Sequence, residues 1–145
     1  MEAVALMRMR SRLLGVGLVG LVLPFLARLP GCVTQGSQWL RQYLGSGLSA
    51  FLFLEAFNLI ALGGALVAAF VVRQRGLWML PVVAGYAYVA YGHGTLDLKS
   101  DAQAAIGLIF IPIYSLPYFA GGGLLAAAVW LAFIRPKGSR SLRRV

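Results

Sequence analysis

The stretch GLSAFLFLEAFNLIALGGALVAAFVV, residues 47–72, holds 26 residues and a single charged side chain, that of Glu55. At 1.5 Å per residue a helix of this length measures about 39 Å, and the hydrocarbon core of a bilayer is about 30 Å thick. The stretch therefore predicts a transmembrane helix. Glu55 is the residue in it that needs an explanation.

The composition of the whole chain agrees with this prediction. Of its 145 residues 60% are hydrophobic and only 12% are charged, with a mean hydropathy of +0.82. A soluble domain does not have this profile. The formal net charge of +9 would suggest nucleic acid in a soluble chain, but here the basic residues flank apolar runs. The expected partner is a lipid bilayer with anionic headgroups, and not nucleic acid.

Four apolar runs can be marked, at residues 13–29, 47–72, 77–93 and 104–134. They predict an all-α integral membrane protein with four transmembrane helices in a single membrane domain, residues 1–145. The fourth run is too long for one straight span, since 31 residues measure about 46 Å as a helix. Pro112 and Pro117 each remove a backbone donor, so this helix is expected to be kinked.

The basic residues predict an orientation. Ten Lys and Arg residues fall on one side of the spans: Arg8, Arg10, Arg12, Arg73, Arg75, Arg135, Lys137, Arg140, Arg143 and Arg144. The other side holds Arg28, Arg41 and Lys99, together with Asp97 and Asp101. The positive-inside rule then places both termini in the cytoplasm. Residues 135–145 are expected to form a basic, flexible cytoplasmic tail near anionic headgroups.

The first run leaves three alternatives open. A basic segment before an apolar core of about 15 residues is also the pattern of a secretory signal. The sequence LPGC, ending at Cys32, resembles a lipoprotein cleavage site. Arg28 and Pro30 beside the cleavage point favour an uncleaved anchor, while acylation at Cys32 and ordinary cleavage are the other two possibilities.

Glu55 is expected to lie roughly 10 Å below the outer boundary of the second span. A charge at that depth is costly, so the side chain should face a partner or water, or be neutral. Asn58 shares its helix face. Tyr88, Tyr91 and Tyr114 come to a similar depth on the third and fourth spans, and the sequence thus predicts an intramembrane polar cluster of these five residues.

Two interpretations of this cluster compete. In the first, Glu55 and its neighbours tie helices together through hydrogen bonds. In the second, Glu55 is a proton or cation site of a transporter or channel. The structural interpretation is the preferred one.

His93, Asp97 and Asp101 recur at intervals of four in the outer loop. On a continuous helix they would share a face and could capture a divalent metal or a substrate. Gly92 and Gly94 bracket the histidine, however, and a capping box of Ser100 and Gln103 predicts that the next helix starts after Asp97. We therefore expect a solvated polar loop and no metal site.

Small residues form ridges on two spans. Ala61, Ala65 and Ala69 recur every four residues, as do Gly123 and Ala127. In lipid such ridges allow the close approach that drives helix association. They are expected to pack the second and fourth spans together, within one chain or between two.

An enzyme is not expected. The sequence offers no nucleophile and base pair and no set of metal ligands, and GVGLVG at residues 15–20 lacks the strand and acid that a dinucleotide site needs. No cofactor is expected either.

The segment LDLKSDAQAAIGLIFIPIY, residues 96–114, resembles one found in small bacterial inner-membrane proteins of uncharacterised function. The resemblance covers about an eighth of the chain and implies a bacterial inner membrane. A four-helix chain with an intramembrane acid is also similar in outline to the small multidrug-resistance transporters, although their essential acid lies in the first span. Length and a charged tail resemble phage holins, which usually have fewer spans.

The sequence thus predicts a small, multi-pass inner-membrane protein that acts as a non-enzymatic accessory or structural subunit. It could form a homo-oligomer or join a larger membrane complex. The alternative is a proton- or cation-linked small transporter using Glu55, with a holin-like protein and a lipoprotein acylated at Cys32 as minor alternatives.

Overall fold

The computed structural model describes residues 2–45, 47–72, 76–99 and 103–134. These ranges contain helices and no strands. The elements are α1 (Glu2–Leu26), α2 (Leu29–Gln35), α3 (Gln38–Leu44), α4 (Leu48–Val71), α5 (Met79–Thr95), α6 (Ala104–Val129) and a π-helical turn, η1 (Trp130–Ile134). The prediction of an all-α chain is confirmed. The tail at residues 135–145 lies outside the described residues, as do Ser100 and Asp101.

Among the described residues, three helical stretches are long and apolar enough to cross a membrane: Leu6–Gln35, Leu48–Val71 and Ala104–Ile134. α5 is shorter, with 17 residues or about 26 Å. α1 starts well before the predicted boundary at residue 13, because Arg side chains extend a helix as readily as apolar ones do. α6 runs without interruption through Pro112 and Pro117.

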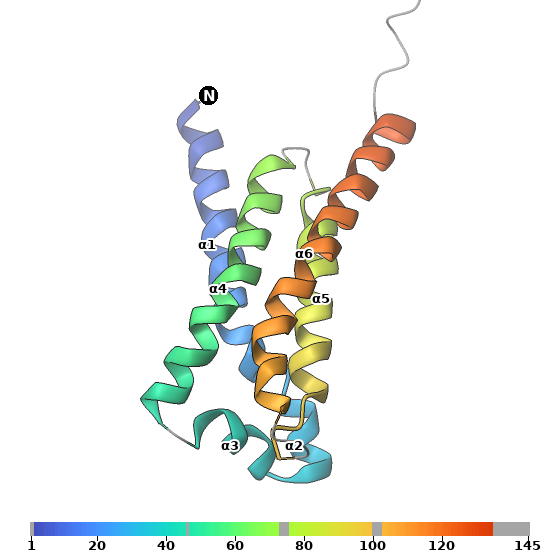
Figure 1. Cartoon of the computed structure of the whole chain (residues 1–145). Helices are drawn as coiled ribbons and strands as arrows, with labels where there is room; N and C mark the ends of the chain where they lie inside the picture. The colour runs from blue at the N-terminus through green and yellow to red at the C-terminus, as the bar shows by residue number, and fades with distance from the viewer. Residues whose placement is uncertain (1, 46, 73–75, 100–102, 135–145) are drawn as a thin grey trace, which may run out of the picture.

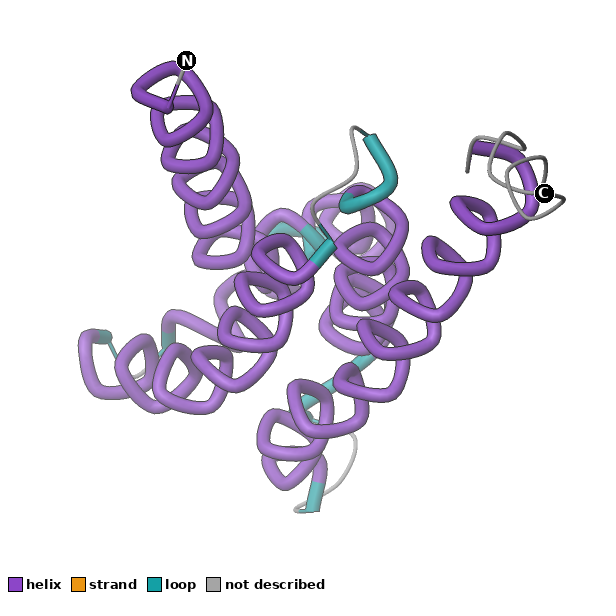
Figure 2. The backbone as a smooth tube through the Cα atoms, turned by 90° about the horizontal axis from the view of Figure 1, so that it is seen from above, coloured by secondary structure: helices purple, strands orange, loops and turns teal. Residues whose placement is uncertain are grey.

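Successive long helices run in opposite directions (Figure 1). The N-terminus and the last residues of α4 and α6 lie at one end of the molecule, which we call the N-terminal end. The short helices α2 and α3 cover the other, the α2–α3 end. α4 and α5 lie between α1 and α6 and contact both of them (Figure 2).

Small residues set the distances between the central helices. Ala61, Ala65 and Ala69 are fully buried on α4, at the centre of the apolar core. On α5, Gly85 lies directly against the ring of Phe119 from α6. Helices approach this closely in lipid where one side carries no bulky side chain. α4 and α6, which carry the predicted ridges, pack against each other within one chain.

Neighbouring glycines of α6 provide a test of this packing. A Cβ atom added at Gly122 would lie 2.5 Å from the Cα atom of Pro81 and 2.9 Å from the carbonyl oxygen of Leu80. Added at Gly121, it would meet no described atom within 4 Å. Gly122→Ala should therefore lower the free energy of unfolding by about 1–3 kcal/mol through overpacking.

The measurement is thermal unfolding of the detergent-solubilised protein, followed by circular dichroism. Gly121→Ala is the matched control, since it brings the same gain in helix propensity without the clash. Equal melting temperatures for the two variants would contradict the close α5–α6 packing.

Candidate functional site

The most extensive polar cluster in the described chain surrounds Arg28, in the turn between α1 and α2. The side chain of Arg28 is 0% exposed. Its Nε donates a hydrogen bond to the carbonyl oxygen of Trp39 at 2.8 Å, and its Nη2 donates to Gln42 Oε1 at 2.8 Å. Both acceptors belong to α3, so Arg28 fixes that short helix against the end of α1.

The same guanidinium also holds the end of α5. Arg28 Nη1 donates to the carbonyl oxygens of His93 and Leu96, at 3.1 and 2.7 Å. Carbonyl groups at a helix C-terminus lack partners within the helix and carry its negative dipole end. Of the five N–H groups of arginine, four are used in this cluster.

Aromatic rings enclose the guanidinium. Its carbon lies 4.3 Å from the ring centre of Trp39 and 4.1 Å from that of Tyr43, within the range of cation–π attraction. The hydroxyl of Tyr43 shares a 2.8 Å hydrogen bond with Nδ1 of His93. Burial raises the pKa of Tyr43 to about 12, so the phenol is neutral at physiological pH. We call Arg28, Trp39, Gln42, Tyr43 and His93 the Arg28 cluster.

Gln42 connects this cluster to the following loop. Its Oε1 also accepts a hydrogen bond from the backbone N–H of Leu98 at 3.0 Å, and its Nε2 donates to Asp97 Oδ1 at 2.9 Å. The same Asp97 oxygen accepts the N–H of Lys99 at 2.9 Å. One amide side chain thus joins the buried cation to a loop carboxylate.

A second polar contact ties α4 to α1. Asn58 Nδ2 donates to the carbonyl oxygen of Gly20 and to Glu55 Oε2, both at 3.0 Å. Glu55 and Asn58 are buried, and Glu55 Oε1 has no hydrogen-bond partner within the described residues. The structure therefore brings together two residues of the predicted polar cluster.

The three predicted tyrosines lie elsewhere. Tyr88 is half-buried and stacks on Tyr118, with ring centres 4.4 Å apart. Tyr91 is 70% exposed and Tyr114 is 55% exposed. None of the three has a hydrogen bond to Glu55 or Asn58.

The tyrosine that reaches the interior from α5 is Tyr86, which donates to the carbonyl oxygen of Val16 at 2.8 Å. The buried face of α5 contains Val82, Tyr86, Val89 and His93. The rotation of α5 about its axis therefore turns Tyr88 and Tyr91 away from α4. The sequence alone did not determine that rotation.

The H-x3-D-x3-D pattern is divided between two environments. His93 is buried in the last turn of α5, and its Nε2 has no hydrogen-bond partner among the described residues. Asp97 lies in the loop beyond α5, bonded to Gln42, and Asp101 lies outside the described residues. Across the described ranges, no group of three His, Cys, Asp or Glu residues could hold a metal ion.

The two ridges also differ in environment. Ala61, Ala65 and Ala69 are 0% exposed, whereas Gly123 is half-buried and Ala127 is exposed. Cys32 is a half-buried thiol in α2.

From the sequence Arg28 was expected to be an outer-loop charge, and the cluster around it was not predicted. One signal was present: Trp39, Gln42 and Tyr43 recur at helical spacing just after a short break, which predicts a helix face with hydrogen-bonding and aromatic groups. The partner of that face could not be identified, since His93 and Leu96 lie 65 and 68 positions after Arg28.

The Arg28 cluster can be tested by Arg28→Met, which keeps an unbranched side chain and removes every donor. The carbonyl groups of His93 and Leu96 and the amide oxygen of Gln42 would then lose a charged donor, at a cost of about 3 kcal/mol or more in the free energy of unfolding. Arg28→Lys should retain part of this stability, because an ammonium group has three donors and cannot reproduce the planar fork. Unfolding by SDS titration in mixed micelles measures the difference.

Arg41→Met is the control for Arg28→Met, since Arg41 lies on α3 but is exposed. If both variants unfold at the same SDS fraction as the parent, Arg28 does not hold the α2–α3 end together.

Comparisons of the chain with protein-family models, with curated proteins and with solved structures found no match. The function must therefore be inferred from the residues and their contacts.

Proposed function

We propose that this chain is a small, non-enzymatic accessory or structural subunit of a membrane complex. The observation that supports it is the outward face of α6. The buried face of α6 runs from Leu108 to Ala126. On the remaining surface Gly123 and Ala127 lie beside Leu124, which is 74% exposed.

This outward face combines the features of a helix-packing surface. An added Cβ at Gly123 would meet no described atom within 4 Å, so another helix could approach the backbone there. α6 and η1 together extend past the last turn of α4 (Figure 1). Leu131 and Phe133 of η1 are exposed. Small residues next to large apolar ones provide the close, shape-matched contacts through which helices associate in lipid.

The buried polar groups favour a structural role over a catalytic or transport role. Arg28 and Asn58 donate hydrogen bonds to backbone carbonyl groups of other helices and to neighbouring side chains. Tyr86 also donates to a backbone carbonyl group. Groups used in this way stabilise one arrangement of the bundle and are not free to bind a substrate.

We also propose a bacterial inner-membrane location with both termini in the cytoplasm. The alternating helix directions support four spans, with α5 as the shortest. α6 would then cross at a tilt or with a bend at its prolines, because it is longer than the hydrocarbon core. If this orientation is correct, a reporter enzyme that is active only in the cytoplasm will be active when it is fused after Val145.

One observation favours a second function, a proton- or cation-linked transporter that uses Glu55. Glu55 Oε1 is buried and has no hydrogen-bond partner in the described part of the chain. A buried carboxyl group with a free oxygen is the kind of group that can exchange a proton or a cation within a membrane.

The subunit proposal predicts a stable partner. Affinity purification of the tagged protein from mildly solubilised membranes should recover a partner in constant ratio, either a second copy or another membrane protein. Gly123→Leu should remove that partner, because the bulky side chain prevents close approach. Gly63→Leu is the control, since an added Cβ at Gly63 also meets no described atom within 4 Å but lies on α4.

A monomer without partners in both variants and in the parent would contradict the subunit proposal. If Gly123→Leu and Gly63→Leu lose the partner equally, the partner does not bind specifically to the outward face of α6.

Substitutions of Glu55 separate the two functions. Glu55→Gln keeps an oxygen that can accept the hydrogen bond of Asn58, so a structural role predicts unchanged folding. Glu55→Leu removes that bond and should lower the free energy of unfolding by about 0.6–2 kcal/mol. Proton flux into liposomes that is present in the parent and absent in Glu55→Gln would establish the transporter instead.

A further inference from the structure

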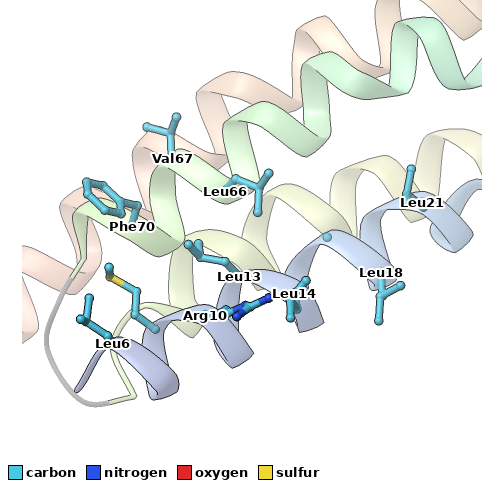
Figure 3. A pocket seen from close by; sticks show the side chains of 11 residues that line it. Leu6, Arg10, Leu13, Leu14, Leu18, Leu21, Leu66, Val67 and Phe70 are labelled. Atoms are coloured by element: carbon cyan, nitrogen blue, oxygen red, sulfur yellow. The ribbon is translucent and has the colours of Figure 1, made fainter. Parts of the chain in front are cut away.

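An apolar groove lies between α1, from Leu6 to Leu21, and the last turns of α4, toward the N-terminal end of the molecule. Its volume is about 860 Å³. The lining residues include Leu13 and Leu18 of α1, with Leu66 and Phe70 of α4 (Figure 3). Arg10 is the single charged residue among them.

Arg10 differs from its neighbour Arg12 in its contacts. Arg12 Nη1 donates to the carbonyl oxygen of Val72 at 3.4 Å, and its guanidinium lies 5.2 Å from the ring centre of Trp78. Arg12 thus belongs to the packing of the bundle. The side chain of Arg10 lies along the groove, as Figure 3 shows, and forms no ion pair or hydrogen bond with any described residue.

The part of the groove from Arg10 inward matches one leaflet of a bilayer in length. Leu21 lies 11 positions after Arg10, or about 16 Å along the helix. Half of the hydrocarbon core measures about 15 Å. A lipid whose phosphate group contacts Arg10 would therefore have acyl chains that reach Leu21.

We propose that this groove binds an anionic glycerophospholipid, with its acyl chains against the leucines and its phosphate group at Arg10. The lipid supplies the negative charge that the described groove residues lack. An apolar transmembrane helix from a second copy would fill the apolar part but would place no negative charge beside Arg10, which is exposed at the edge of the groove. The proposal rests on the membrane location proposed above and does not depend on a subunit role.

Native mass spectrometry of the full-length protein, titrated with phosphatidylglycerol in detergent, tests the site. One bound lipid should be retained at higher collision energy than the rest. Phosphatidylcholine with the same acyl chains should bind more weakly. Arg10→Gln should weaken phosphatidylglycerol binding about fivefold, the contribution of one basic residue beside an anionic headgroup. Arg8→Gln is the control, because Arg8 is exposed like Arg10 but does not line the groove.

A second pair of variants tests the apolar part of the groove. Gly17 lines it and Gly15 does not, and an added Cβ at either position meets no described atom within 4 Å. Gly17→Leu should reduce binding of both lipids, and Gly15→Leu should leave it unchanged.

Two outcomes would overturn the proposal. If Arg8→Gln and Arg10→Gln weaken phosphatidylglycerol binding equally, the lipid is attracted to the basic segment as a whole and not to a site at Arg10. Loss of a dimer in Gly17→Leu, with lipid binding unchanged, would make a second copy the occupant of the groove.

Discussion

The structure depends on one buried cation. Arg28 has no contact with solvent, yet it bonds to α3 and to the last turn of α5 through four of its N–H groups. An isolated charge inside a protein would be costly by several kcal/mol. Here carbonyl dipoles at the end of α5 and the aromatic faces of Trp39 and Tyr43 replace the hydration of the guanidinium. Because the acceptors come from segments distant in sequence, the same contacts that stabilise the charge also fix the position of those segments.

Hydropathy was enough to predict an all-helical chain with helices long and apolar enough to cross a membrane, and helix periodicity predicted that Glu55 and Asn58 share a face. Both properties are local. The environment of a tyrosine on α5 is not local, because it depends on the rotation of that helix, and Tyr86 is buried while Tyr91 points outward. The role of Arg28 could not be predicted for a related reason: three of its four hydrogen-bond acceptors are backbone carbonyl groups, which no residue type identifies.

Small residues and polar residues stabilise the bundle in different ways. Ala61, Ala65 and Ala69 bring α4 into close contact with its neighbours, where van der Waals packing is the main attraction in lipid. Polar side chains then select one arrangement among the many that such smooth surfaces allow. Asn58 and Tyr86 reach the carbonyl groups of Gly20 and Val16, two positions one helical turn apart on α1. These bonds set the rotation of α1 against α4 and α5.

The distribution of these bonds explains where the groove forms. α1 is held by polar contacts at Val16, at Gly20 and at Arg28, all in its second half or just beyond it. Its first half has the long hydrogen bond from Arg12 to Val72, at the end of α4. Leu14, Leu18 and Leu21, which line the groove, are exposed on α1, whereas Val16 and Gly20 between them are buried. The groove therefore lies on the face of α1 that these polar contacts leave uncovered.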